Sequence, residues 1–148
     1  MRSFEILRTV REAIYAAMVD TAAAPSAESL ARTQGLTTSL VEDAYRELAD
    51  AHVIVLEPGS TTIRAAPPFS AVPTPFLVRS AASAWYAPCA WDSFGIPAAL
   101  KHGAHIEARC AWSGEPVPCG VERGGSYGDG FIHLLVPAAH FWDDIVYT

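Results

Sequence analysis

The sequence predicts an α+β protein in which an N-terminal winged helix-turn-helix precedes a small mixed α/β domain. Apolar residues recur at intervals of three and four through residues 4–51, which is the period of an α-helix. An alternating stretch then surrounds the turn at residues 57–60, as in a β-hairpin. The next segment, residues 67–80, contains four prolines. We therefore expect a winged-helix domain over residues 1–66, a proline-rich linker over residues 67–80 and a second domain over residues 81–148.

Three helices are expected in the first domain. Helical spacing of apolar residues predicts the first between Phe4 and Val19. Ser26 is the expected N-cap of a short second helix, which ends at a turn at Gly35. Thr37 or Thr38 is the expected N-cap of the third helix. A glycine turn between the second and third helices is typical of a helix-turn-helix.

A hairpin and a linker follow these helices. Residues 52–66 alternate about a Glu-Pro-Gly-Ser turn, so we expect them to form the wing. The prolines of residues 67–80 lack a backbone N–H and restrict the backbone angle φ. We therefore expect neither a regular helix nor a central strand in the linker itself, before a strand that begins at Phe76.

The second domain is expected to be a small sheet with one main helix. The expected strands are Phe76–Arg79, Ser83–Tyr86, His105–Ala111, Val117–Glu122 and a buried strand at Phe131–Val136. A helix is expected from about Pro88 to Leu100, and a short one from Pro137 to Ile145. The glycine-rich residues 123–130 are expected to form a loop.

Composition excludes several classes of protein. Half of the 148 residues are apolar and 18% are charged, so a sizeable core is expected rather than disorder. The formal net charge is −6 and no cluster of Lys and Arg is present, which argues against a generic polyanion binder. No apolar run has the length of a membrane span, and the N-terminus lacks the apolar core of a signal peptide. We therefore expect a cytoplasmic protein.

The stretch YAPCAWDSFGIPAAL, residues 86–100, places a thiol three residues before a carboxyl group in an apolar segment. If Pro88 begins a helix, Cys89 lies in its first turn and Asp92 lies on the same face. The positive end of the helix dipole would then favour the thiolate form of Cys89. The three cysteines of the chain are widely spaced and form no Cys-x-x-Cys pair, so free thiols are expected.

These residues resemble the active-site segment of the organomercurial (alkylmercury) lyases. That family pattern is an aromatic residue, a cysteine, two further residues, an aspartate and a small apolar run with Pro-Ala. Tyr86, Cys89, Asp92 and Pro97–Ala98 occupy those places. The likeness continues through residues 108–117 and 132–148, and residues 65–76 look like the linker of some members.

The resemblance implies an alkylmercury-lyase core that cleaves a carbon–mercury bond by protonolysis. In that family two cysteine thiolates hold the mercury and the aspartate supplies the proton, which gives Cys89 and Asp92 catalytic roles. No cofactor is implied, and Hg(II) is the product that remains bound. The family's second mercury-binding cysteine would fall one or two residues beyond Thr148, so a spare thiol would have to replace it. Cys119 is our candidate for this second metal ligand, ahead of Cys110, which matches a structural cysteine of the family.

Each of these residues also has a plainer interpretation. Most free cysteines are small buried apolar side chains, and an aspartate at the start of a helix often faces solvent. The histidines at 102, 105, 133 and 140 are not spaced as a set of metal ligands. The tryptophans are most simply core residues, although Trp85 and Trp91 flank Cys89 and would wall a small apolar pocket.

Two other functions fit the sequence. A catalytically incomplete family member would act as a partner subunit, in a homo- or hetero-oligomer formed through its incomplete C-terminal edge. A winged-helix regulator that senses a metal or small molecule is the other. On its expected recognition helix, however, four acidic residues surround Arg46 and would be repelled by phosphates. We therefore expect a small-molecule substrate, and neither nucleic acid nor a membrane as partner.

Overall fold

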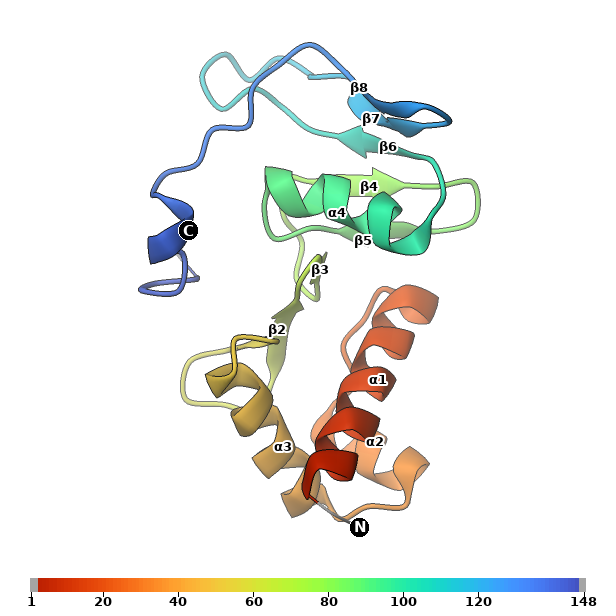
Figure 1. Ribbon diagram of the computed structural model, residues 1–148, viewed down its shortest axis with the longest axis vertical. Coiled ribbons are helices and arrows are strands. Elements are labelled where there is room, and N and C mark those ends of the chain that lie inside the picture. The colour runs from red at the N-terminus through yellow and green to blue at the C-terminus, as the bar shows by residue number, and fades with distance from the viewer. Residues whose placement is uncertain (1–2, 147–148) are drawn as a thin grey trace.

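The computed structural model describes residues 3–146, which form a mixed α+β structure (Figure 1). The helices in this range are α1 (Ser3–Thr21), α2 (Ala27–Gln34), α3 (Thr38–Asp50), α4 (Ala90–Leu100) and the 3-10 helix η1 (Ala138–His140). Helices α1 to α3 lie together at one end of the molecule, and α4 lies beside β4 at the other (Figure 1). Among the described residues, no helix combines the length and apolar character that crossing a membrane requires.

Eight strands in the described range form one antiparallel sheet. They are β1 (Val55–Leu56), β2 (Ile63–Ala66), β3 (Phe69–Ser70), β4 (Leu77–Arg79), β5 (Ala84–Tyr86), β6 (Ala104–Glu107), β7 (Cys119–Glu122) and β8 (Gly125–Tyr127). Their order across the sheet is β1-β2-β3-β5-β4-β6-β7-β8. The predicted α+β class is confirmed by this combination of helices and antiparallel sheet.

The three N-terminal helices match the predicted ones closely. Ser26 caps α2, because its hydroxyl accepts a hydrogen bond from the Ser29 N–H at 3.1 Å. Gly35 ends the helix in the left-handed conformation, with a φ of 66° that glycine adopts without strain. Thr37, rather than Thr38, caps α3. The caps expected from the sequence therefore set the bounds of both short helices.

The proline-rich linker contributes a strand to the middle of the sheet, so that part of the prediction was wrong. Strand β3 pairs with β2 on one side and with β5 on the other, where Ser70 lies opposite Tyr86. Proline excludes a central strand only where its own N–H is needed. Phe69 and Ser70 lie between Pro68 and Pro73 and keep their donors. One sheet therefore passes through all three predicted segments, while their division into separate domains stays a prediction.

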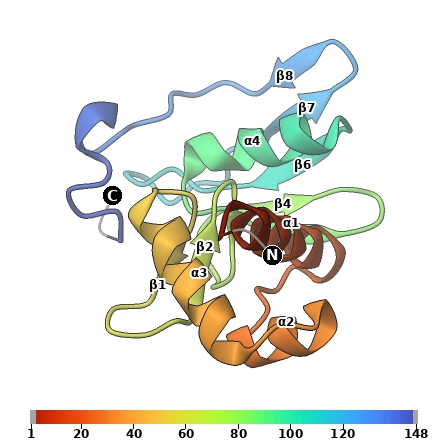
Figure 2. The ribbon, with the colours of Figure 1, turned by 60° about the horizontal axis from the view of Figure 1, so that its bottom comes forward.

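The glycine-rich residues 123–130 do not form a simple loop, because they contain β8. This strand pairs with β7, and Glu122 lies opposite Gly125. Gly124 and Gly125 have backbone φ values of 111° and 136°, which residues other than glycine rarely adopt. The glycines thus supply the tight turn of a hairpin, seen at the upper edge of the sheet in Figure 2.

The buried strand expected at Phe131–Val136 is not formed. This segment has no regular secondary structure, and most of its apolar side chains are exposed; Phe131 is 103% exposed. An apolar run predicts a buried strand only if a neighbouring edge is available to pair with it, which the sequence pattern does not reveal. The helix expected after Pro137 is reduced to the single turn of η1, and the chain then returns toward α3 (Figure 2).

Trp85 on β5 joins the sheet to the first helix. Its side chain is 3% exposed, and its indole N–H lies 3.1 Å from the Met18 carbonyl oxygen and 3.0 Å from that of Val19. Both carbonyls belong to the last turn of α1. Phe69 of β3 contacts the same indole ring edge-on. The end of α1 is thereby fixed to β5, the strand that leads into α4.

We predict that Trp85→Phe destabilises the fold by about 1–3 kcal/mol, because it removes the indole N–H that the Met18 and Val19 carbonyl oxygens share and reduces apolar packing. Urea unfolding followed by circular dichroism would measure the change. Trp112→Phe is the control, since Trp112 is 97% exposed and its replacement should leave stability unchanged. Equal effects of the two substitutions would contradict this role of Trp85.

Candidate functional site

The candidate site lies where β5 passes into α4. Cys89 is the N-cap of this helix rather than a residue of its first turn, and Pro88 precedes the cap. The backbone of Cys89 is extended, with φ −146° and ψ 175°. Its sulfur accepts a hydrogen bond from the Asp92 N–H at 3.5 Å, in place of the oxygen of a usual cap. The expected start at Pro88 was therefore wrong by two residues, because the thiol itself caps the helix.

The pairing of Cys89 with Asp92 is present in the structure. The Cys89 thiol donates to Oδ2 of Asp92 at 3.4 Å. Capping brings this contact about, since a side chain at the N-cap faces the residue three positions later. Both residues are partly buried. A sulfur nucleophile and a carboxyl group therefore share one helical turn, as the three-residue spacing indicated.

Burial controls the protonation of both groups. It raises the pKa of the Cys89 thiol, and the Asp92 carboxylate raises it further, while the backbone N–H groups of Asp92 and Trp91 lower it. The helix terminus does favour the thiolate, as expected, but desolvation outweighs the amide donors, so the net shift of the Cys89 pKa is upward. Burial also raises the pKa of Asp92, and the Cys89 thiol lowers it. A buried carboxyl with a raised pKa is suited to hold and deliver a proton.

The aromatic wall expected around Cys89 is only half present. Trp85 belongs to the core through its hydrogen bonds to α1, and the hollow that it lines with Leu100 and His102 includes neither Cys89 nor Asp92. Trp91 is 66% exposed and lies in the first turn of α4, between Cys89 and Asp92 in sequence. Ser93 is buried and donates to the Ala90 carbonyl oxygen at 2.6 Å. Of the two flanking tryptophans, Trp91 is therefore the one whose side chain is exposed enough to contact a bound molecule.

The other two thiols differ from Cys89 and from each other. Cys119 on β7 is buried in the core, and its sulfur lies 3.9 Å from the Ile106 carbonyl oxygen on β6. Cys110 lies in a tight turn, where hydrogen bonds from Ser113 lower the pKa of its thiol. Within the described residues no group of three or more His, Cys, Asp or Glu side chains is arranged to hold a metal ion. A second thiolate ligand from Cys119 stays a prediction.

The histidines have structural contacts. The ring of His102 stacks on Trp85 at 6.0 Å between ring centroids, His105 is hydrogen-bonded to the Tyr127 hydroxyl, and His140 pairs with Asp143.

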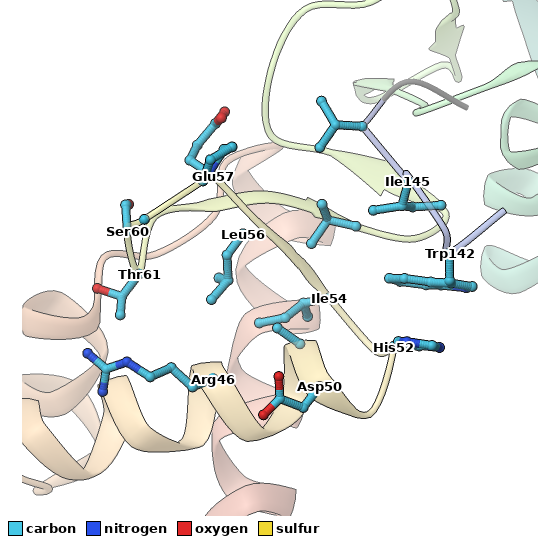
Figure 3. A pocket seen from close by; sticks show the side chains of 15 residues that line it. Arg46, Asp50, His52, Ile54, Leu56, Glu57, Ser60, Thr61, Trp142 and Ile145 are labelled. Carbon is cyan, nitrogen blue, oxygen red and sulfur yellow. The ribbon is translucent and has the colours of Figure 1, made fainter.

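Sequence reasoning missed a hollow between α3, the β1–β2 hairpin and the C-terminal segment (Figure 3). His52 and Trp142 stack face to face at one side of it, with ring centroids 4.2 Å apart and planes 2° apart. Arg46, Asp50 and Glu57 also line it. Its lining includes neither Cys89 nor Asp92. No motif signals this hollow, because its walls come from segments almost a hundred positions apart in sequence.

A thiol that caps a helix therefore contacts a partly buried carboxyl group, on a helix that packs beside an antiparallel sheet. The family model described as MerB, alkylmercury lyase, matches residues 69–148. The chain therefore belongs to the alkylmercury lyase family, and the resemblance inferred from the sequence is confirmed.

One solved structure, the mercury-bound form of MerB2, is similar in fold. The TM-score is 0.63 and 26% of residues are identical. The match covers 83% of this chain and 58% of that one, so the chain spans less than two thirds of the length of MerB2. No curated protein matches the sequence.

We predict that Cys110 is alkylated by iodoacetamide about tenfold faster than Cys89 at pH 8, because the thiolate is the reactive form and the two pKa values shift in opposite directions. Peptide mass spectrometry of the folded protein, sampled over time, would measure both rates. The difference should disappear in urea, where both thiols are solvated. Faster reaction at Cys89 in the folded protein would contradict the balance of burial and capping described above.

Asp92→Asn should change how stability depends on pH. The raised pKa means that the folded chain binds this proton more tightly than the unfolded chain does. The resulting stabilisation is complete below the ordinary pKa of 3.8 and is lost as the pH rises through the folded-state value. The stability of the variant relative to the wild type should therefore increase between about pH 3 and pH 7. Urea unfolding at both pH values tests this, and a relative stability that falls with pH would refute it.

Proposed function

We propose that the chain cleaves carbon–mercury bonds by protonolysis, with Cys89 as mercury ligand and Asp92 as proton donor. The observation that supports this is the 3.4 Å contact between the Cys89 thiol and the Asp92 carboxylate, within the segment that matches the alkylmercury lyase family. A small organomercurial is the substrate, and Hg(II) is the product that stays on the thiolate.

The first step exchanges a proton for a metal. The Cys89 sulfur forms a bond to the mercury of an R–Hg–X compound and X leaves as its anion, where X is a thiolate or halide. The thiol proton passes along the existing hydrogen bond to Oδ2 of Asp92. Sulfur is the ligand that a soft metal prefers, which favours this exchange even though the resting thiol is protonated.

The second step uses the proton that Asp92 has received. The carboxylic acid transfers it to the carbon attached to mercury, and the electron pair of the carbon–mercury bond becomes the new carbon–hydrogen bond. The hydrocarbon R–H leaves, Hg(II) remains on the Cys89 thiolate, and Asp92 is again a carboxylate. Burial of Asp92 makes the acid form easier to populate and so assists this transfer.

We interpret helices α1 to α3 and the β1–β2 hairpin as a winged-helix-like unit that supports α4 rather than one that binds DNA. Arg46 on α3 is already paired with Asp43 at 2.9 Å and with Glu42 at 3.6 Å. Its charge is therefore not available to a phosphate. Helix α1 of this unit is hydrogen-bonded to Trp85, on the strand that leads into α4, and to Pro67 of the proline segment. These hydrogen bonds favour the supporting role.

Incubation with phenylmercury and a small thiol, followed by gas chromatography of the benzene released, tests this function. We expect one equivalent of benzene per chain in a single turnover. Cys89→Ala should release none, and Asp92→Asn should be slower by about a hundredfold or more, because the proton must then come from water.

Cys110→Ala is the matched control in the same assay, because it removes a thiol that lies outside the Cys89–Asp92 pair, and it should leave release unchanged. Release from Cys89→Ala at the wild-type rate, or no release from the wild type, would refute the proposed chemistry.

A further inference from the structure

The helix that carries the candidate site rests on the proline segment. A Cβ atom built at Gly95 of α4 would lie 3.2 Å from the Cβ of Pro68, so the helix backbone approaches the proline ring closely at this point. Gly95 follows Asp92 by three positions and therefore lies one turn further along the same side of the helix. Pro68 thus limits how near α4, with its capping thiol and carboxyl group, can come to the N-terminal unit.

A side chain from α1 holds this proline segment in turn. The Tyr15 hydroxyl lies 3.0 Å from the Pro67 carbonyl oxygen and 3.3 Å from that of Val53, and its single proton is shared between them. Burial is the main cause that raises the pKa of Tyr15, so the phenol stays protonated and keeps donating at neutral pH. The charge of Arg11 lowers the pKa of Tyr15, and the charge of the Asp92 carboxylate raises it.

These contacts form a continuous connection from α1 to the site. It runs from Tyr15 to Pro67 by a hydrogen bond, along the chain to Pro68, and from Pro68 to Gly95 by close packing. We propose that Tyr15 is a positioning residue, which acts through Pro67 and Pro68 to set the placement of α4 and hence of the Cys89–Asp92 pair. This inference rests on the proposed function for its catalytic meaning, although the positioning itself can be measured without it.

The chain offers a matched control for this role. Tyr45 on α3 is buried, whereas Tyr15 is half-buried, and the Tyr45 hydroxyl donates to the Pro25 carbonyl oxygen at 3.0 Å. Tyr15→Phe and Tyr45→Phe therefore each remove a hydrogen bond from a phenol to a proline carbonyl, and Tyr15→Phe also removes the longer contact with the Val53 carbonyl. The two differ in that Pro67 leads to α4 through Pro68, whereas Pro25 precedes α2. A general loss of stability should appear in both variants.

A second variant perturbs the same contact from the other side. Gly95→Ala would press its new Cβ against Pro68, so the proline segment and α4 must separate by a few tenths of an ångström. Alanine is also the better helix former, so this variant should not weaken the helix itself. A functional change in Gly95→Ala without a loss of stability would therefore indicate displacement of α4.

The experiment compares these three variants with the wild type in two measurements. The first is the rate of Cys89 alkylation by iodoacetamide at pH 8, followed by peptide mass spectrometry. We expect Tyr15→Phe and Gly95→Ala to raise this rate by about threefold or more, because displacement of α4 loosens the contacts that bury and cap the thiol. Tyr45→Phe should match the wild type.

The second measurement is benzene release from phenylmercury in a single turnover over a range of phenylmercury concentrations. Tyr15→Phe and Gly95→Ala should lower the maximal rate by about tenfold, because proton transfer depends on the placement of Asp92. The concentration for half-maximal rate should not change, since the sulfur ligand remains. Urea unfolding of each variant would show that it is folded under the assay conditions.

The outcomes separate the two proposals. Alkylation of Cys89 at equal rates in Tyr15→Phe and Tyr45→Phe, or an unchanged rate in Gly95→Ala, would overturn the positioning role. No benzene release from the wild type would refute the proposed function, while the alkylation rates would still decide whether Tyr15 places the pair.

Discussion

The pairing of β3 on both of its sides is the constraint on which the rest of the structure depends. This strand has two residues, yet it connects the hairpin of β1 and β2 to the strands that carry the site. Ser70 lies opposite Tyr86 at the end of β5, three residues before Cys89. Phe69 is buried against Trp85, which in turn is bound to the end of α1. The position of the capping thiol therefore depends on backbone pairing that occurs inside the proline-rich segment.

The site illustrates a competition between two effects of known sign. A helix N-terminus offers N–H donors and a favourable dipole to an anion, which on their own would lower the pKa of a capping thiol. Burial removes the water that would solvate the same anion. Because Cys89 and Asp92 are partly buried together and each contacts the other, desolvation prevails for both groups. Burial thus favours the protonated form of each group, and the thiol is already hydrogen-bonded to the carboxyl group that would receive its proton.

Local signals in the sequence were sufficient for α1 to α3 and for the Cys89–Asp92 pair. The capping residues Ser26, Gly35 and Thr37 act through neighbours within four positions, so short-range patterns contain the required information. Strand β3 and the irregular segment after Gly130 depend instead on which sheet edges are free, and this is decided by distant residues. Strand β8 pairs locally with β7, and the many glycines of this stretch obscured the hairpin. The stacking of His52 on Trp142 and the support of α4 by Tyr15 are likewise tertiary, and no spacing predicts them. The pKa direction of Cys89 could not be predicted because spacing does not specify burial.

The protonated state of the Cys89 thiol also has a consequence for selectivity. Any cation that binds this sulfur must first displace its hydrogen, so affinity is reduced for every metal by the same amount at a given pH. Magnesium and calcium, which prefer oxygen, gain too little from sulfur to overcome that reduction. Metals of high thiophilicity gain enough free energy from the bond to sulfur to overcome the reduction. Burial of the thiol would therefore prevent binding of abundant ions that have little affinity for sulfur. It would still allow binding of rare metals that form strong bonds with sulfur.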